Sequence, residues 1–244
     1  MKRVGVIGCG AIGVIIAEAF ERRVLSCDEL VIYDYELERA EKLKSQLRFP
    51  ARVVLSLDEM LRLKPKVIVE AASQQAAREY VPRIVAKGIN VIVMSTGALL
   101  GLNMQTGRVH VPSGAIGGLD ALSAAALSGV DEVVLTTRKN PKALDANLVG
   151  ETVVYEGDAE EAARRFPREM NVAATLALTV KPARVRVRVV SDPLVHRNTH
   201  EISVKWRFGE MFLRFANDPH PDNPRTSALA AWSATSLLRT LLEK

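Results

Sequence analysis

The sequence is poor in several residue types, and each shortage argues against a class of protein. Only two of its 244 residues are cysteine, and neither belongs to a C-x-x-C or Cys/His cluster, so a disulfide framework and a structural zinc site are not expected. Aromatic residues make up 5%, without a basic and aromatic platform for nucleic acid. The 33 basic and 28 acidic side chains are scattered, so the net charge of +5 forms no polybasic arm.

Long hydrophobic runs are also scarce, and the two that resemble membrane signals have better interpretations. Residues 4–17 follow Met1-Lys2-Arg3 as in a secretory signal, but this run contains glycines at phosphate-loop spacing and precedes a helix and strand pattern. Residues 88–107 lack a formal charge over the length of a membrane span, but polar residues and glycines interrupt them. We therefore expect a cytoplasmic protein that does not cross a membrane and does not bind nucleic acid.

Apolar runs alternate with amphipathic segments of helical spacing in the first part of the chain. The runs that we assign to strands are residues 2–8, 29–34, 51–55, 67–70 and 89–94. Continuous apolar strands separated by such helices are typical of a parallel sheet that is covered on both faces. The sequence therefore predicts a Rossmann-type doubly wound α/β fold here.

The pattern changes after about residue 108, where apolar and polar residues begin to alternate with a period of two. Arg184, Arg186 and Arg188 alternate with valines, and the same alternation runs from Ile202 to Phe208. Gly209-Glu210 suits a hairpin turn before a return strand. We expect a second, smaller α+β domain with an antiparallel or mixed sheet, followed by a closing helix over residues 226–242.

The sharpest motif is Gly8-Cys9-Gly10-Ala11-Ile12-Gly13, which follows the first strand and opens the first helix. Gly8 permits a tight turn, Gly10 lets the backbone approach a pyrophosphate, and Gly13 lets helix and strand pack closely. The helix N-terminus adds free N–H groups for the phosphates. We expect a dinucleotide to bind at Gly8, Gly10, Ala11, Ile12 and Gly13. The alternative is a glycine turn kept for packing.

Asp34 ends the second strand, 21 residues after Gly13. A carboxylate at this position can accept hydrogen bonds from the adenosine ribose hydroxyls. The 2′-phosphate of NADP would meet like charge there, so the sequence favours NAD as the cofactor without excluding NADP. The alternative is a solvated strand end.

A nicotinamide cofactor implies hydride transfer, so the second part of the chain must supply the substrate site and an acid or base. The chain has four histidines, which are His110, His196, His200 and His220. His196 and His200 flank an extended segment, in which four residues span about 13 Å, too far for one metal ion. No metal site is therefore expected. The residues alone leave open whether either histidine is catalytic or structural.

Several segments together resemble L-aspartate dehydrogenases along nearly the whole chain. The most specific are residues 111–120 (V-P-S-G-A-I-G-G-L-D) and 197–202 (R-N-T-H-E-I). Further matches are residues 70–74, 136–141, 171–175 and 223–227. The resemblance implies a homodimer that oxidises L-aspartate with NAD or NADP to iminosuccinate. This product hydrolyses to oxaloacetate and ammonia or feeds quinolinate and NAD synthesis.

The resemblance also implies roles for residues and boundaries for domains. His200 matches the active-site histidine, and Ala115 and Asn171 match cofactor-contacting positions. Residues 1–108 are implied to form a dinucleotide-binding domain that the C-terminal segment 212–244 completes. Residues 109–211 are implied to form the substrate, catalytic and dimerisation domain.

The chemistry of the residues is compatible with this reaction. The amine of aspartate must lose protons as the C=N bond forms, so a histidine with a pKa near 7 suits this transfer or activation of the attacking water. We assign this role to His200. The two substrate carboxylates need cations, and Arg138, Lys139 and Arg197 are candidates, although each is also an ordinary candidate for a surface charge.

Two other functions fit the same pattern. One is another two-domain nicotinamide-dependent reductase of the aspartate pathway, and the other is a non-catalytic NAD(H)-sensing protein. Arginine outnumbers lysine and the amides are few, a balance compatible with a thermophilic source.

Overall fold

The computed structural model describes residues 1–102, 107–144, 148–167, 170–220 and 223–243. The chain divides into two compact units, of which the first comprises Met1–Pro112 and Ala230–Lys244 and the second Ser113–Leu229. The second unit therefore extends past residue 211, the boundary that we expected. The reason is that the strand Gly209–Asn217 (β11) pairs over its whole length with the strand Asn198–Trp206 (β10), which fixes it to the second unit.

The first unit is built around a parallel six-stranded sheet with the order β3-β2-β1-β4-β5-β6. Its strands are β1 (Arg3–Ile7), β2 (Glu29–Tyr33), β3 (Ala51–Val53), β4 (Val67–Glu70), β5 (Asn90–Val93) and β6 (Val109–His110). The first five confirm the strands expected from the apolar runs. The uncharged segment 88–107 forms β5 and the short 3₁₀ helix η1 (Thr96–Leu99), while residues 103–106 lie outside the described residues.

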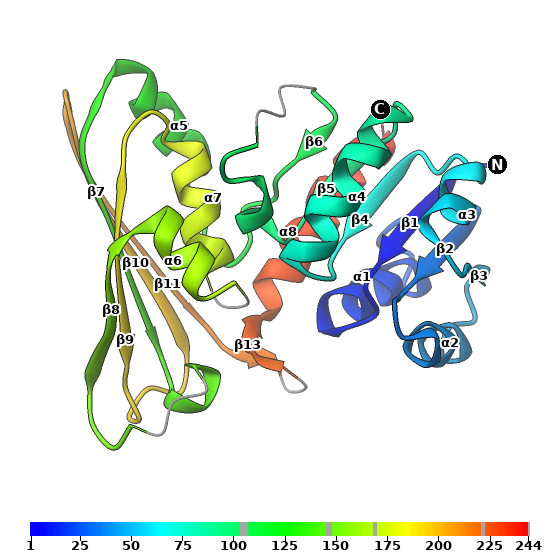
Figure 1. Ribbon diagram of the computed structural model, residues 1–244, viewed down its shortest axis with the longest axis horizontal. Coiled ribbons are helices and arrows are strands. Elements are labelled where there is room, and N and C mark those ends of the chain that lie inside the picture. The colour runs from blue at the N-terminus through cyan, green and yellow to red at the C-terminus, as the bar shows by residue number, and fades with distance from the viewer. Residues whose placement is uncertain (103–106, 145–147, 168–169, 221–222, 244) are drawn as a thin grey trace. The chain divides into compact units, whose positions relative to one another are not determined.

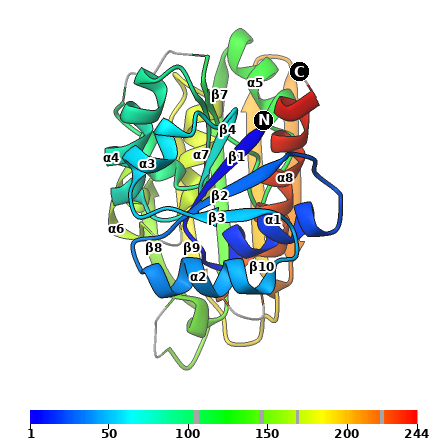
Figure 2. The same cartoon turned by 90° about the vertical axis from the view of Figure 1, so that its right-hand side faces the viewer.

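Helices cover both faces of this sheet, as Figure 2 shows. The helices are α1 (Ala11–Glu21), α2 (Leu37–Gln46), α3 (Leu57–Arg62), α4 (Gln74–Ala86) and α8 (Ala228–Glu243). Side chains from α1, α2 and α8 pack with β1, β2 and β4 in one buried cluster that includes Phe20, Leu43 and Leu238. The closing helix thus belongs to the first unit, and the predicted doubly wound fold is confirmed.

The second unit contains a mixed five-stranded sheet with the order β11-β10-β7-β9-β8. Besides β10 and β11, its strands are β7 (Val130–Lys139), β8 (Thr152–Asp158) and β9 (Val185–Ser191), and β7 runs parallel to β9. The helices α5 (Leu119–Ser128), α6 (Ala159–Arg165) and α7 (Asn171–Thr179) lie along one face of this sheet, as Figure 1 shows. The smaller elements are η2 (Pro141–Leu144), β12 (Pro219–His220) and β13 (Asn223–Ser227).

One turn of this unit differs from the turn that the sequence predicts. The hairpin between β10 and β11 turns at Arg207 and Phe208, because Trp206 pairs with Gly209, so the expected turn at Gly209-Glu210 is wrong.

None of the helices in the described part of the chain has the length and apolar character needed to cross a membrane.

Candidate functional site

The loop between β1 and α1 has the geometry that a closely approaching phosphate requires. Gly8 has a φ of +96°, and a Cβ there would lie 2.5 Å from the Ala71 carbonyl oxygen. A Cβ on Gly13 would overlap the Gly8 carbonyl oxygen. In contrast, a Cβ built on Gly10 meets no described atom within 4 Å, and no described side chain caps the N-terminus of α1. The open space therefore lies where helix N–H groups are available.

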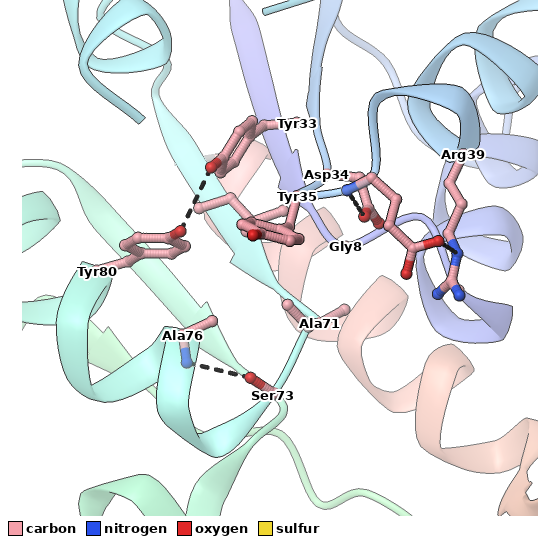
Figure 3. Close-up of a pocket in the computed structure, with 13 residues that line it drawn as sticks. Gly8, Tyr33, Asp34, Tyr35, Arg39, Ala71, Ser73, Ala76 and Tyr80 are labelled. Atoms are coloured by element: carbon pink, nitrogen blue, oxygen red, sulfur yellow. Dashed lines mark hydrogen bonds and ion pairs between the residues drawn. The ribbon is translucent and has the colours of Figure 1, made fainter. Parts of the chain in front are cut away.

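Asp34 follows β2 and holds this loop in place. Its Oδ2 accepts a hydrogen bond from the Cys9 N–H at 2.7 Å, and its Oδ1 accepts one from the Glu36 N–H at 2.9 Å. Figure 3 shows the side chain beside Gly8. Each carboxylate oxygen has a second lone pair, so Asp34 can accept a further bond from a hydroxyl while it holds the loop.

A pocket of about 290 Å³ lies at the carboxyl ends of β1, β2 and β4, where open α/β sheets bind ligands. Gly8, Gly10 and Asp34 line it together with Tyr33 and Tyr80. The hydroxyls of the two tyrosines point toward each other in Figure 3 and lie 3.4 Å apart. The glycine loop, the acceptor and the aromatic wall fit the phosphates, ribose and base of a dinucleotide.

A cation that we did not consider also lines this pocket. The Arg39 guanidinium forms an ion pair with Glu36 at 2.9 Å, and both side chains are 57% exposed. Ion pairs this exposed contribute little stability, so Arg39 can exchange Glu36 for another anion at small cost. The pocket therefore holds positive charge near Asp34, whose negative charge was the basis for expecting NAD.

Glu70 is a further residue whose importance the sequence did not reveal. It ends β4 with 0% exposure, and its Oε1 accepts bonds from the Ala72 N–H and the Ser95 hydroxyl, both at 2.9 Å. Its Oε2 accepts the Ser95 N–H at 3.1 Å. Burial raises the pKa of Glu70 despite these bonds. The carboxylate thereby joins the loops after β4 and β5, and Ala72 lines the pocket. In the sequence, this role of Glu70 is signalled by an acidic residue at the end of an apolar run.

The second unit contains a buried group of polar side chains, which we call the polar cluster: Thr137, Lys139, Ser191 and His200. His200 pairs with Thr137 across β10 and β7, and Lys139 pairs with Ser191 across β7 and β9. The His200 Nδ1 lies 3.1 Å from the Thr137 Oγ1. None of the four side chains is more than 2% exposed, so two of the predicted site residues lie together in the core.

The electrostatics of His200 differ from our expectation. Burial and the positive charge of Lys139 lower the pKa of His200 to about 3, not near 7. The imidazole is therefore neutral at pH 7 in the absence of a ligand. A negative charge placed beside it would favour the imidazolium and raise this pKa.

Arg138 and Arg197 do not join the polar cluster. Arg138 points to the opposite face of β7 from Lys139 and forms ion pairs with Glu151 at 2.9 Å and Asp192 at 2.8 Å. The hydrogen bond that Arg138 donates to Glu151 raises the pKa of Arg138 above its ordinary value. Arg197 is exposed and pairs with Asp218 at 2.8 Å. Of the three expected substrate cations, the structure brings only Lys139 to His200.

Ala115 and Asn171, the other predicted cofactor positions, lie in the second unit. The Ala115 carbonyl oxygen accepts a hydrogen bond from the Asn217 Nδ2 at 2.9 Å, and Asn171 is the first residue of α7. The pocket of the first unit is lined by other residues. The contact of Ala115 and Asn171 with a cofactor therefore stays a prediction.

Comparison with known proteins gives matches over both parts of the chain. Residues 120–241 match the family model "Aspartate dehydrogenase, C-terminal", and residues 8–107 match "Homoserine dehydrogenase, NAD binding domain". The L-aspartate dehydrogenase of Archaeoglobus fulgidus is 42% identical over 250 residues, covering 98% of each chain. That of Methanothermobacter thermautotrophicus is 40% identical over 255 residues, covering 100% of this chain and 97% of the relative.

Solved structures agree with these matches. The crystal structure of aspartate dehydrogenase from Thermotoga maritima has a TM-score of 0.75 at 30% identity, covering 99% of this chain and 97% of that chain. A myo-inositol dehydrogenase from Lactobacillus casei, solved with NAD(H) and myo-inositol, has a TM-score of 0.58 at 11% identity, covering 100% of this chain and 86% of that chain. The second likeness shows a shared fold only.

The burial of His200 predicts a pH dependence of stability. Its pKa is about 3 in the folded protein, whereas an unfolded histidine has a pKa of about 6.5, so between these values the unfolded state binds more protons. The free energy of unfolding should therefore fall on acidification below pH 6.5, with His200 contributing up to about 1.4 kcal/mol per pH unit. His200→Asn should flatten this slope in urea titrations between pH 4 and 6.5. Parallel slopes for the two proteins would contradict the prediction.

Proposed function

Because this chain belongs to the aspartate dehydrogenase family, we propose that it oxidises L-aspartate to iminosuccinate with a nicotinamide cofactor in a reversible reaction. The observation that carries the proposal is the match to L-aspartate dehydrogenases along the full chain. The iminosuccinate hydrolyses to oxaloacetate and ammonia or enters NAD biosynthesis. We also propose that the chain works as a homodimer, which the resemblance to L-aspartate dehydrogenases implies.

The first unit supplies the residues that would hold the cofactor. Gly8, Gly10 and Gly13 leave room for the pyrophosphate, and the start of α1 at Ala11 and Ile12 offers N–H groups to it. Asp34 accepts the adenosine ribose hydroxyls. We propose Ala115 and Asn171 as further cofactor-contacting residues, because the resemblance to L-aspartate dehydrogenases implies this role for them. A bound nicotinamide would supply the acceptor for the hydride that leaves C2 of aspartate.

His200 moves the protons of the reaction. As the C=N bond forms, the amine nitrogen loses protons, and the neutral imidazole of His200 is able to accept one. The two carboxylates of L-aspartate bring negative charge to the imidazole, which raises the pKa of His200 from about 3 and strengthens it as a base. For Nε2 to accept this proton, Nδ1 carries the hydrogen and donates it to the Thr137 Oγ1, which lies 3.1 Å away.

The reaction itself is tested by absorbance at 340 nm with purified protein, L-aspartate and NAD, and in reverse with oxaloacetate, ammonium and NADH. We expect turnover in both directions, and faster turnover with aspartate than with glutamate, alanine or malate. Turnover only with homoserine or dihydrodipicolinate would identify a different reductase. NADH binding without any turnover would instead identify a sensing protein.

The role of His200 predicts a loss of turnover without a loss of cofactor binding. Because general acid–base groups contribute typically 10²- to 10⁴-fold, His200→Ala should lower kcat by about this factor. The Kd for NADH, measured by fluorescence titration, should stay within about twofold of wild type, since the nucleotide pocket lies in the first unit. A variant that keeps near wild-type turnover would remove His200 from the mechanism.

The charges of the pocket predict how the cofactor is selected. We propose that NAD is preferred through Asp34 and that NADP is accepted because Arg39 can bind the 2′-phosphate. Asp34→Ala should therefore narrow the ratio of kcat/KM for NAD over NADP, and Arg39→Ala should widen it. Glu41→Ala on the same helix is the control and should leave the ratio unchanged. An unchanged ratio in both test variants would show that the adenosine ribose is recognised elsewhere.

A further inference from the structure

Glu70 is the buried carboxylate at the end of β4, and the proposed mechanism gives it no role. It accepts hydrogen bonds from the N–H groups of Ala72, Ser73 and Ser95 and from the Ser95 hydroxyl. All four contacts are donors, which is the pattern that an ionised carboxylate satisfies. Burying a carboxylate destabilises a fold unless such donors accompany it, so four donors gathered at one buried acid need an explanation.

The loop after β4, which Glu70 holds through Ala72 and Ser73, forms a wall of the nucleotide pocket. Ala71, Ala72 and Ser73 line the pocket together with Gly8. Figure 3 shows Ala71 and Ser73 along the segment that leads from β4 to α4. This wall also touches the glycine loop, because a Cβ on Gly8 would lie 2.8 Å from the Ala72 nitrogen. A shift of the wall would therefore change the pocket where the glycine loop receives the phosphates.

The loop after β5 provides the other attachment of Glu70. Ser95 is 7% exposed and is not one of the residues that line the pocket. The segment that follows it, Thr96–Leu99, is buried throughout. A Cβ on Gly97 would overlap the Gln74 side chain, so this segment also packs against the first residue of α4. Glu70 thus connects the pocket wall to a buried segment of the same unit.

We propose that Glu70 is a positioning residue for the cofactor, whose carboxylate holds residues 71–73 in the conformation that receives the dinucleotide. The inference rests on the proposed function and deepens it, since it concerns the cofactor site. If only a fraction of the molecules has this loop in place, the apparent Kd for the cofactor rises in inverse proportion to that fraction. The complex, once formed, is the same. Glu70 therefore controls the affinity for the cofactor and not the turnover of the saturated enzyme.

The test uses the full-length enzyme with Glu70→Gln, which keeps the shape of the side chain and removes one acceptor oxygen. Either orientation of the amide turns an NH2 donor toward a backbone N–H, that of Ala72 or that of Ser95. A hydrogen bond to a charged group corresponds to about 10- to 100-fold, so the Kd for NADH and the KM for NAD should rise at least about 10-fold. The kcat at saturating NAD and the KM for L-aspartate should stay within about twofold of wild type, because the occupied site is unchanged.

Glu21→Gln is the matched control. The Glu21 Oε2 also accepts two backbone N–H groups, those of Arg48 and Phe49 at 3.0 and 2.8 Å, but Glu21 is not one of the residues that line the pocket. This variant should lower the Tm without changing the Kd for NADH. Ser95→Ala removes one donor to Glu70 and should raise the Kd for NADH by about 2- to 10-fold. If Glu70→Gln fails to fold, Ser95→Ala provides the test.

Fluorescence titration with NADH needs no turnover, so it separates this inference from the proposed function. A lower Tm with a wild-type Kd for NADH in Glu70→Gln and Ser95→Ala would overturn the inference, since Glu70 would then only stabilise the fold. A raised Kd in a protein that does not oxidise L-aspartate would keep the role of Glu70 and refute the function. Normal turnover of the wild type with an unchanged Kd in both variants would keep the function and refute that role.

Discussion

The contact between Gly13 and the Gly8 carbonyl oxygen is the constraint on which the nucleotide pocket depends. Because residue 13 has no Cβ, α1 begins directly against the loop that leaves β1. This places the helix N-terminus over the open space at Gly10 and keeps the Cys9 N–H within reach of Asp34. A side chain at residue 13 would push α1 away from β1, and both the phosphate cradle and the link to β2 would be lost.

The two units bury polar groups for different purposes. In the first, the Glu70 carboxylate accepts bonds from both loops that it joins, so the buried group fixes the backbone of these loops. In the second, the buried Ser191 hydroxyl has no hydrogen-bond partner among the described residues. Buried polar groups that have all their hydrogen-bond partners stabilise the fold. A buried polar group without a partner is a candidate contact for a ligand.

The sequence was sufficient for features that depend on neighbours along the chain. The apolar runs predicted five strands of the first sheet, and the glycine loop and Asp34 are local signals. Features that depend on strand pairing were out of reach. Thr137 and Ser191 meet His200 and Lys139 only through the register of β7, β9 and β10, and adjacent Arg138 and Lys139 point to opposite faces. The helices α6 and α7 were not predicted, because their short alanine-rich segments lack a clear period, and the strand β8 was not predicted either.

The environment of His200 would let a buried histidine take the proton-transfer role that we propose for it. Removal from water and the nearby ammonium favour the neutral imidazole, which leaves one ring nitrogen with a free lone pair at pH 7. The same low dielectric that depresses its pKa also strengthens its interaction with any charge that enters. A dicarboxylate therefore changes the basicity of His200 far more in this core than it would at a surface. An uncharged substrate would bring no such change, so under the proposed mechanism the polar cluster would couple recognition of an acidic substrate to proton transfer.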